Sequence, residues 1–184
     1  RKVLKMGQQG KHLNSIKVSH EKHTAGCATE IMAIPETVCI SMSQHIGAPC
    51  KPLVKKGDQV KVGQLIGDTD AFVSAPIHSS VSGTVKEIST IRSVTGGDDQ
   101  VVIIETDGNQ DVYEEIKPPV INDMKDFIAA VRASGLVGLG GASFPTHIKL
   151  NPKNLEEVDT LIVNAAECEP FITSDHRLML ENTE

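Results

Sequence analysis

The stretch "PLVKKGDQVKVGQLIGD", residues 52–68, decides how the first half of this chain folds. Its apolar residues form short β-type runs, which glycines such as Gly57 and Gly63 interrupt. Glycine supplies the backbone freedom that a tight turn requires. A second, similar unit follows in "SAPIHSSVSGTVKEI", where Pro76 and Gly83 occupy the turn positions. Short strands between closely spaced glycine turns predict a small barrel or sandwich.

Two further strands flank these units. The run "TVCISM" at residues 37–42 alternates between apolar and polar residues, as a half-buried strand does. The run "QVVIIET" at residues 100–106 is rich in β-branched residues and follows the turn "TGGDD". We therefore predict a β-rich domain over residues 36–117.

The composition limits what the core can contain. The chain has 184 residues, of which 39% are hydrophobic, with no Trp, one Tyr and four Phe, so its core must be built from aliphatic side chains. Its apolar runs are far shorter than the ~20 residues that span a bilayer. Without a recognisable secretory leader, the cysteines are expected to be reduced thiols.

The N-terminal segment, residues 1–35, is polar and basic. Such a segment can contact nucleic acid or an anionic membrane, or it can be a solvated, poorly ordered leader. The second interpretation is favoured, and no nucleic-acid partner is predicted, because no aromatic residues interleave with the charges. His20, His23 and Cys27 have zinc-ligand chemistry, but a closed zinc site needs a fourth ligand that is not obvious, so no metal site is predicted.

Residues 117–123, "KPPVIND", form the predicted domain boundary, because consecutive prolines fit neither a helix nor a central strand. The period of the apolar residues then becomes helical, with Asn122 or Asp123 as the N-cap and Gly135 just past the end. A buried strand is expected at Thr160–Asn164, and a further helix opens at "DHRLMLENTE". One helix and one strand cannot close an α/β layer, so residues 118–184 are expected to be the incomplete start of a second domain, in a fragment of a larger protein.

The paired β units resemble a barrel-sandwich hybrid of the biotinyl or lipoyl type. Proteins that carry those cofactors attach them to a lysine on the hairpin between the units. Here that hairpin is "DTDAFVS", residues 68–74, which contains no lysine. A carrier role is therefore not supported, and the barrel is expected to serve as a docking or structural module.

The stretch "GLVGLGGASFPTHIKL", residues 135–150, concentrates glycine after the predicted helix. Glycine at 138, 140 and 141 would let backbone N–H groups approach a phosphate or a flat ring. Lys149 could add a positive charge, and Thr146 a hydroxyl donor. The spacing fits neither a P-loop nor a dinucleotide fingerprint, so an ordinary structural turn remains the alternative.

The stretch "NAAECEP", residues 164–170, follows the expected buried strand. Nucleotides bind at the carboxyl ends of strands in α/β domains, where Asn164, Glu167 and Glu169 could accept or donate hydrogen bonds. A solvated acidic loop is the alternative. Cys168 is interpreted as structural, because no histidine neighbours it in sequence.

Taken together, "SQHIGAPCKPLVKKGDQVKVGQLIG", "GLVGLGGASFPTHIKL" and "LIVNAAECEPFITSDHRLM" resemble the RnfC subunit of the Rnf ion-translocating ferredoxin:NAD oxidoreductase complex. The resemblance covers roughly residues 36–184 and extends, more distantly, to the flavin-bearing NADH-binding subunit of respiratory complex I. A soluble RnfC-like paralogue, such as the proline reductase-associated electron transfer protein, fits as well.

The resemblance implies a mixed α+β chain, with a barrel-sandwich hybrid followed by the start of an α/β, Rossmann-like domain that binds FMN and NADH. The positions that match the cofactor-binding residues of the family are Gly138, Gly140, Gly141, Ala142, Lys149, Asn164, Glu167 and Glu169. The complex I pattern has Arg where Leu139 stands and Asp where Ala166 stands, and both differences remove polar contacts.

The implied function is an electron transfer subunit that oxidises NADH through FMN and passes electrons to 4Fe-4S clusters in a C-terminal part absent here. The cofactors would do the chemistry, so no catalytic side chain is assigned. Expected partners are the other subunits of a redox complex, either Rnf-type membrane subunits or a soluble reductase, at a cytoplasmic location that includes the inner face of the membrane. The alternative is a non-catalytic docking or scaffold subunit with a vestigial nucleotide cradle.

Overall fold

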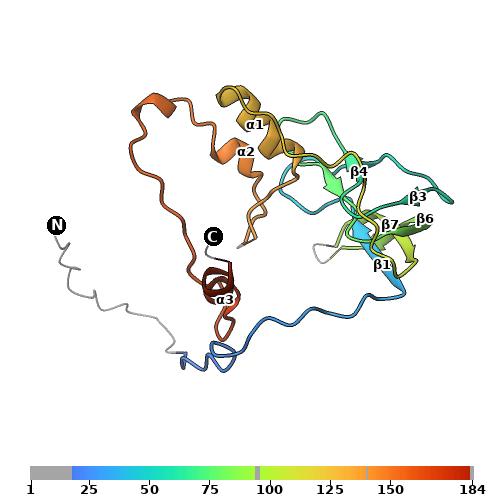
Figure 1. Ribbon diagram of the computed structural model, residues 1–184, viewed down its shortest axis with the longest axis horizontal. Helices are drawn as coiled ribbons and strands as arrows, with labels where there is room; N and C mark the ends of the chain where they lie inside the picture. Colours follow the sequence, from blue (N-terminus) through green and yellow to red (C-terminus); the bar gives the residue numbers. More distant parts are fainter. Residues whose placement is uncertain (1–17, 94–95, 140, 183–184) are drawn as a thin grey trace. The chain divides into compact units, whose positions relative to one another are not determined.

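The computed structural model describes residues 18–93, 96–139 and 141–182 (Figure 1). The chain divides into two compact units. The larger unit is Glu30–Val163 and contains both β-sheets. The smaller unit joins the segment before Glu30 to the segment that begins at Asn164.

Two antiparallel sheets make up the β-rich part of the larger unit. The four-stranded sheet has the order β1-β7-β6-β3, with β1 at Thr37–Ser41, β7 at Asp98–Thr106, β6 at Gly83–Arg92 and β3 at Gln59–Val60. The three-stranded sheet has the order β2-β4-β5, with β2 at Lys51–Pro52, β4 at Leu65–Asp68 and β5 at Ile77–His78. The strands predicted at residues 37–42 and 100–106 are both present, and the glycine-rich turns separate short strands as expected.

The two sheets share one aliphatic core, as the aromatic-poor composition predicted. Its buried members are Ile40, Met42, Cys50, Val60, Ile66, Ile77, Val81, Val85, Val102 and Ile104. Gly83 shows why this fold needs glycine. Its φ is +156°, and a Cβ at that position would lie 2.1 Å from the carbonyl oxygen of Glu105 on the neighbouring strand.

The hairpin predicted at residues 68–74 connects β4 to β5, which pair with each other. It is tied internally, because the buried Ser74 donates its hydroxyl to the carbonyl oxygen of Ala71 at 2.6 Å. Phe72 stands out from the hairpin with 82% of its surface exposed.

The predicted helix after the proline boundary is α1, Met124–Ala133. Asp123 is its N-cap and accepts a hydrogen bond from the backbone N–H of Asp126 at 2.9 Å. Gly135 follows the helix with a φ of +72°, the left-handed conformation that favours glycine after a helix end. The larger unit also contains the short helix α2, Thr146–Lys149, and a 3₁₀ turn, η1, at Leu155–Glu157.

The prediction of a buried strand at residues 160–164 is wrong for this chain. The structure describes these residues but assigns them no strand. Leu161, Ile162 and Val163 are 79%, 83% and 80% exposed. A strand needs neighbouring strands to satisfy its backbone groups, and none of the described strands pairs with this segment.

The smaller unit is built around α3, Ser174–Glu181, which is the helix expected at the end of the chain. Part of the basic N-terminal segment packs on it rather than standing free in solvent. The ammonium group of Lys22 donates to the carbonyl oxygen of Ile172 at 2.7 Å, and the hydroxyls of Thr24 and Thr173 lie 2.6 Å apart. Residues 18–29 are thus mostly exposed but hydrogen-bonded to the smaller unit, and residues 1–17 lie outside the described part, so the solvated leader stays a prediction.

Candidate functional site

The glycine loop is closed at its base by backbone hydrogen bonds. The N–H of Gly138 donates to the carbonyl oxygen of Phe144 at 2.9 Å, and the N–H of Thr146 donates to that of Leu136 at 3.0 Å. Between these bonds, Val137 and Pro145 form an antiparallel bridge. The loop is therefore a defined structure that leads directly into α2.

Lys149 lies next to the glycine backbone at the start of this loop. A Cβ built on Gly138 would lie 2.7 Å from the ammonium nitrogen of Lys149. Glycine at 138 thus leaves room for a positive charge to rest against the main chain. The structure thus brings Gly138 and Lys149 together, and their predicted contact with the flavin stays a prediction.

The tip of the loop is open. Gly141 has a φ of +140°, and a Cβ built on it would meet nothing within 4 Å. Ala142 is exposed, and Leu139 is 93% exposed. Gly140, also predicted to contact the cofactor, lies outside the described residues. The described part of the loop therefore offers bare backbone with free space at Gly141 and a lysine against Gly138, a combination that suits a flat, phosphorylated ligand.

A groove between α1 and α2 adjoins the loop. Its volume is about 280 Å³, and it is lined by Met124, Lys125, Ile128, Ala129, Arg132, His147 and Asn151. Burial, and then the nearby charge of Arg132, lower the pKa of His147. The Nδ1 atom of His147 is buried and has no hydrogen-bond partner among the described residues. His147 is therefore a neutral side chain at physiological pH.

Asn164, Glu167 and Glu169 belong to the smaller unit. The side-chain oxygen of Asn164 accepts a hydrogen bond from the N–H of Ala166 at 3.0 Å, and Glu169 is exposed. The two units are separate bodies in the structure, so the predicted meeting of these residues with the glycine loop stays a prediction.

Glu167 has a local partner that the sequence did not reveal. Its carboxylate accepts hydrogen bonds from the N–H of His176 at 3.1 Å and from the hydroxyl of Ser174 at 3.2 Å, in the first turn of α3. Desolvation opposes ionisation, but these bonds outweigh it and lower the pKa of Glu167. Glu167 therefore caps α3, a role that Thr173 does not fill because its side chain makes no cap hydrogen bond.

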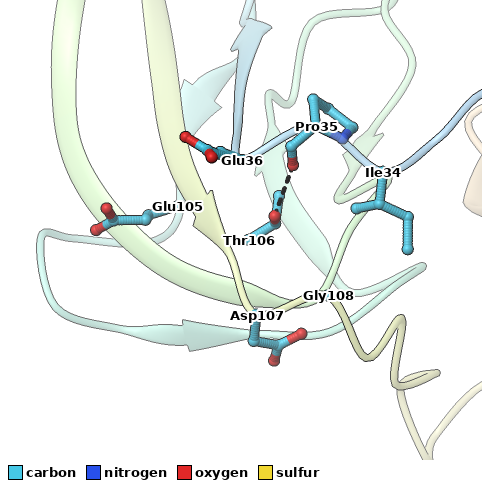
Figure 2. Close-up of a pocket in the computed structure, with 7 residues that line it drawn as sticks. All are labelled: Ile34, Pro35, Glu36, Glu105, Thr106, Asp107 and Gly108. Carbon is cyan, nitrogen blue, oxygen red and sulfur yellow. Dashed lines mark hydrogen bonds between the residues drawn. The ribbon is translucent and has the colours of Figure 1, made fainter.

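Another cavity, of about 420 Å³, lies at the end of β7, where Glu36, Glu105 and Asp107 are among the lining residues (Figure 2). The hydroxyl of Thr106 donates to the carbonyl oxygen of Pro35 at 2.6 Å across it. In Figure 2 the carboxylates of Glu105 and Asp107 point in different directions. These acidic side chains do not converge on a common point.

The possible zinc ligands of the N-terminal segment are not gathered into a cluster. Cys27 donates weakly to the carbonyl oxygen of His23, with the sulfur 3.9 Å away, and His23 lies 3.6 Å from the carboxylate of Glu21. Over the ranges that the structure describes, no group of three or more His, Cys, Asp or Glu side chains could hold a metal ion. Within the same ranges, no helix has both the length and the apolar character needed to cross a bilayer.

Comparison with known proteins identifies both halves of the chain. Residues 11–109 match the family model described as the RnfC barrel sandwich hybrid domain, and residues 131–184 match the Nuo51 FMN-binding domain. The predicted barrel-sandwich hybrid followed by the start of a flavin-binding domain is confirmed. All eight candidate cofactor residues lie within the second match.

Curated relatives extend this similarity to nearly the whole chain. The C subunit of the proton-translocating ferredoxin:NAD(+) oxidoreductase complex of Clostridium ljungdahlii is 45% identical over 99% of this chain. The C subunit of the Na(+)-translocating complex of Acetobacterium woodii is 48% identical over 82%, and that of the ion-translocating oxidoreductase complex of Rhodobacter capsulatus is 37% identical over 90%.

The matched regions span only 40%, 34% and 33% of the lengths of these three relatives. The sequence therefore corresponds to a minor part of each relative, and within it lie the matches to the barrel domain and to the FMN-binding domain. With a family model that matches more than half of its residues, this chain belongs to the RnfC family.

Proposed function

We propose that this chain forms the flavin-binding start of an electron transfer subunit, in which FMN lies against the glycine loop. The observation that carries the proposal is the ammonium group of Lys149 resting against Gly138, at the base of a loop closed by hydrogen bonds. That loop lies inside the match to an FMN-binding domain.

The described residues fit the chemistry of FMN. Bare backbone at Gly141 leaves room for a planar ring or a phosphate, while the space beside Gly138 holds the ammonium group of Lys149. N–H groups of glycine loops are good anion donors. Lys149 would supply the positive charge that a phosphate or an electron-rich ring edge attracts. Ala142 lies in the exposed part of the same loop, where its small side chain leaves the approach open.

FMN, when bound, would supply a hydride acceptor for NADH and a one-electron donor for iron–sulfur clusters. The residues of this chain would hold and orient the two ligands. Asn164 and Glu169 are exposed and available for hydrogen bonds with the flavin or the nicotinamide nucleotide. Glu167 would affect ligand binding indirectly. Its carboxylate accepts hydrogen bonds from the first turn of α3 and so helps to fix the conformation of residues 164–170.

The partners follow from the names of the relatives, which are subunits of ion-translocating ferredoxin:NAD(+) oxidoreductase complexes. We propose that this chain likewise serves a multisubunit redox complex and lies peripherally on the inner face of the membrane. The 4Fe-4S clusters would be held by residues outside this sequence.

A docking subunit with a vestigial cradle is the second candidate. It is favoured by Leu139, which is 93% exposed at the loop tip where the complex I pattern has arginine. An apolar side chain cannot replace the polar contact that arginine offers to a phosphate.

Titration of the full-length natural polypeptide with FMN and then with NADH separates the candidates. We expect flavin fluorescence to be quenched with one equivalent bound, and the flavin absorbance to bleach when NADH is added. An absence of both changes would favour the docking subunit.

A further inference from the structure

The hairpin between β4 and β5 holds the helix that precedes the glycine loop. The guanidinium group of Arg132, in the last turn of α1, donates to both carboxylate oxygens of Asp68, at 2.9 and 3.3 Å. It also donates to the carbonyl oxygen of Thr69 at 3.0 Å. Forked pairs of this kind fix orientation as well as distance, because two parallel bonds leave little rotational freedom.

The start of the glycine loop is pressed against the same part of the barrel. A Cβ built on Gly135 would lie 2.5 Å from the carbonyl oxygen of Pro76 and 3.1 Å from the ring of His78. Only a residue without a side chain permits this approach. Gly135 thus has a second role besides ending α1, since it lets the chain touch β5 and its preceding residue.

The hairpin itself is firmly held by the rest of the barrel. The buried His45 accepts a hydrogen bond from the N–H of Ala75 at 3.2 Å, and the thiol of Cys50 donates to the carbonyl oxygen of Ala75 at 3.2 Å. A Cβ on Gly47 would lie 2.1 Å from the carbonyl oxygen of Val73. These contacts make the hairpin a rigid support.

Electrostatics favour the ion pair at neutral pH. Partial burial opposes the ionisation of Asp68, but hydrogen bonds from Arg132 and from the N–H of Thr69 outweigh it and lower the pKa of this carboxyl group. Burial lowers the pKa of the neighbouring His78, although Asp68 opposes that shift. Arg132 therefore faces a charged carboxylate beside a neutral imidazole.

We infer that Asp68 and Arg132 are positioning residues for the glycine loop. The hairpin at residues 68–74, which bears the cofactor lysine in carrier proteins, would here hold that loop in place. The ion pair joins the region matched to the RnfC barrel with the region matched to the FMN-binding domain. The expected effect of this ion pair on FMN affinity rests on the proposed function. Its expected effect on the order of the glycine loop does not.

The test uses the full-length natural polypeptide with Asp68→Asn, which keeps the shape of the side chain and removes its charge. Asp58→Asn is the matched control, because Asp58 pairs with Lys55 at 3.0 Å within the barrel and does not contact α1. Hydrogen–deuterium exchange is measured over residues 136–149 and over the barrel strands, and FMN affinity is measured by fluorescence quenching.

We expect Asp68→Asn to speed exchange over residues 136–149 and to weaken FMN binding about tenfold, because a loosened loop must be ordered again when FMN binds. Exchange in β6 and β7 should not change, and NADH should still bleach the flavin fully at saturating FMN. Asp58→Asn should leave all these values at the wild-type level. Arg132→Gln should reproduce the effect from the other partner, and the double variant should be no worse than either single one.

Unchanged loop exchange in both Asp68→Asn and Arg132→Gln would overturn the inference. If the wild type binds no FMN while the variants still loosen the loop, the proposed function fails and the anchoring role stands. If FMN binds and neither variant affects the loop or the affinity, the anchoring role fails alone. Should Asp68→Asn not fold, Arg132→Gln on the surface of α1 decides the outcome.

Discussion

Similar aliphatic residues are buried in the barrel and exposed in the segment that follows η1. In the barrel, Val85 and Ile104 are 1% and 0% exposed, whereas Ile162 and Val163 are 83% and 80% exposed. The residue types do not explain the difference. Barrel strands pair with neighbouring strands, as β6 does with β7. Residues 160–164 have no partner strand among the described residues, so an apolar, β-branched run is not enough to make a buried strand.

The largest effect is expected from adding a side chain where β6 approaches β7 most closely, at Gly83. Gly83→Ala would place a Cβ 2.1 Å from the carbonyl oxygen of Glu105, and should lower the free energy of unfolding by at least about 3 kcal/mol. Gly57→Ala is the control. Its φ is also positive, at +91°, but its Cβ would meet nothing within 4 Å. Its cost should be about 1 kcal/mol, from backbone strain alone.

Chemical denaturation of this 184-residue chain measures both values. Equal losses for Gly83→Ala and Gly57→Ala would mean that strand contact at Gly83 is looser than the structure shows.

A polar substitution in the exposed segment should have much less effect than a substitution in the barrel core. Ile162→Ser should change the unfolding free energy of this chain by less than about 0.5 kcal/mol, because the side chain is exposed.

Val85→Ala serves as the reference, since it truncates a buried barrel side chain and should cost about 2 kcal/mol. Equal losses for Ile162→Ser and Val85→Ala would contradict the exposure of residues 160–164.

The smallest effect concerns the smaller unit at acid pH. Hydrogen bonds from Arg177 and from Thr29 lower the pKa of Glu181 to about 2. The pKa of Glu181 in the folded chain lies below the usual 4.5. The stability that these hydrogen bonds add to the smaller unit is therefore fully present above pH 4.5 and is lost as the pH falls through about 2. Carboxyl NMR titration of Glu181 measures the shift, and Arg177→Gln should raise the pKa toward its usual value. A normal pKa in the wild type would show that the N-terminal segment does not hold α3 through this residue.

Elements with local signals could be predicted from the sequence. The cap at Asp123 and the helix stop at Gly135 each depend on residues within or next to their own element, whereas Gly83, predicted in a turn, begins strand β6. The ion pair between Asp68 and Arg132 could not be predicted, because it joins residues far apart in sequence and neither residue type carries a positional signal.

The candidate site shows the same division. The bare backbone of the glycine loop could be predicted from its composition, and Lys149 from its resemblance to the family pattern. The cap that Glu167 forms on α3 was missed, because a carboxylate several residues before a helix has no fixed capping position. Whether Asn164 and Glu169 meet the glycine loop depends on how the two units pack, which local sequence does not encode.

The most direct measurement is FMN binding by the full-length polypeptide with Lys149→Ala, beside Lys153→Ala as the control. Lys153 is an exposed lysine close in sequence, outside the glycine loop. We predict that Lys149→Ala weakens FMN binding by about 1.5–3 kcal/mol, the worth of one charge-assisted hydrogen bond, and that Lys153→Ala leaves it unchanged. Equal affinity in the wild type and both variants would contradict the placement of FMN against the glycine loop.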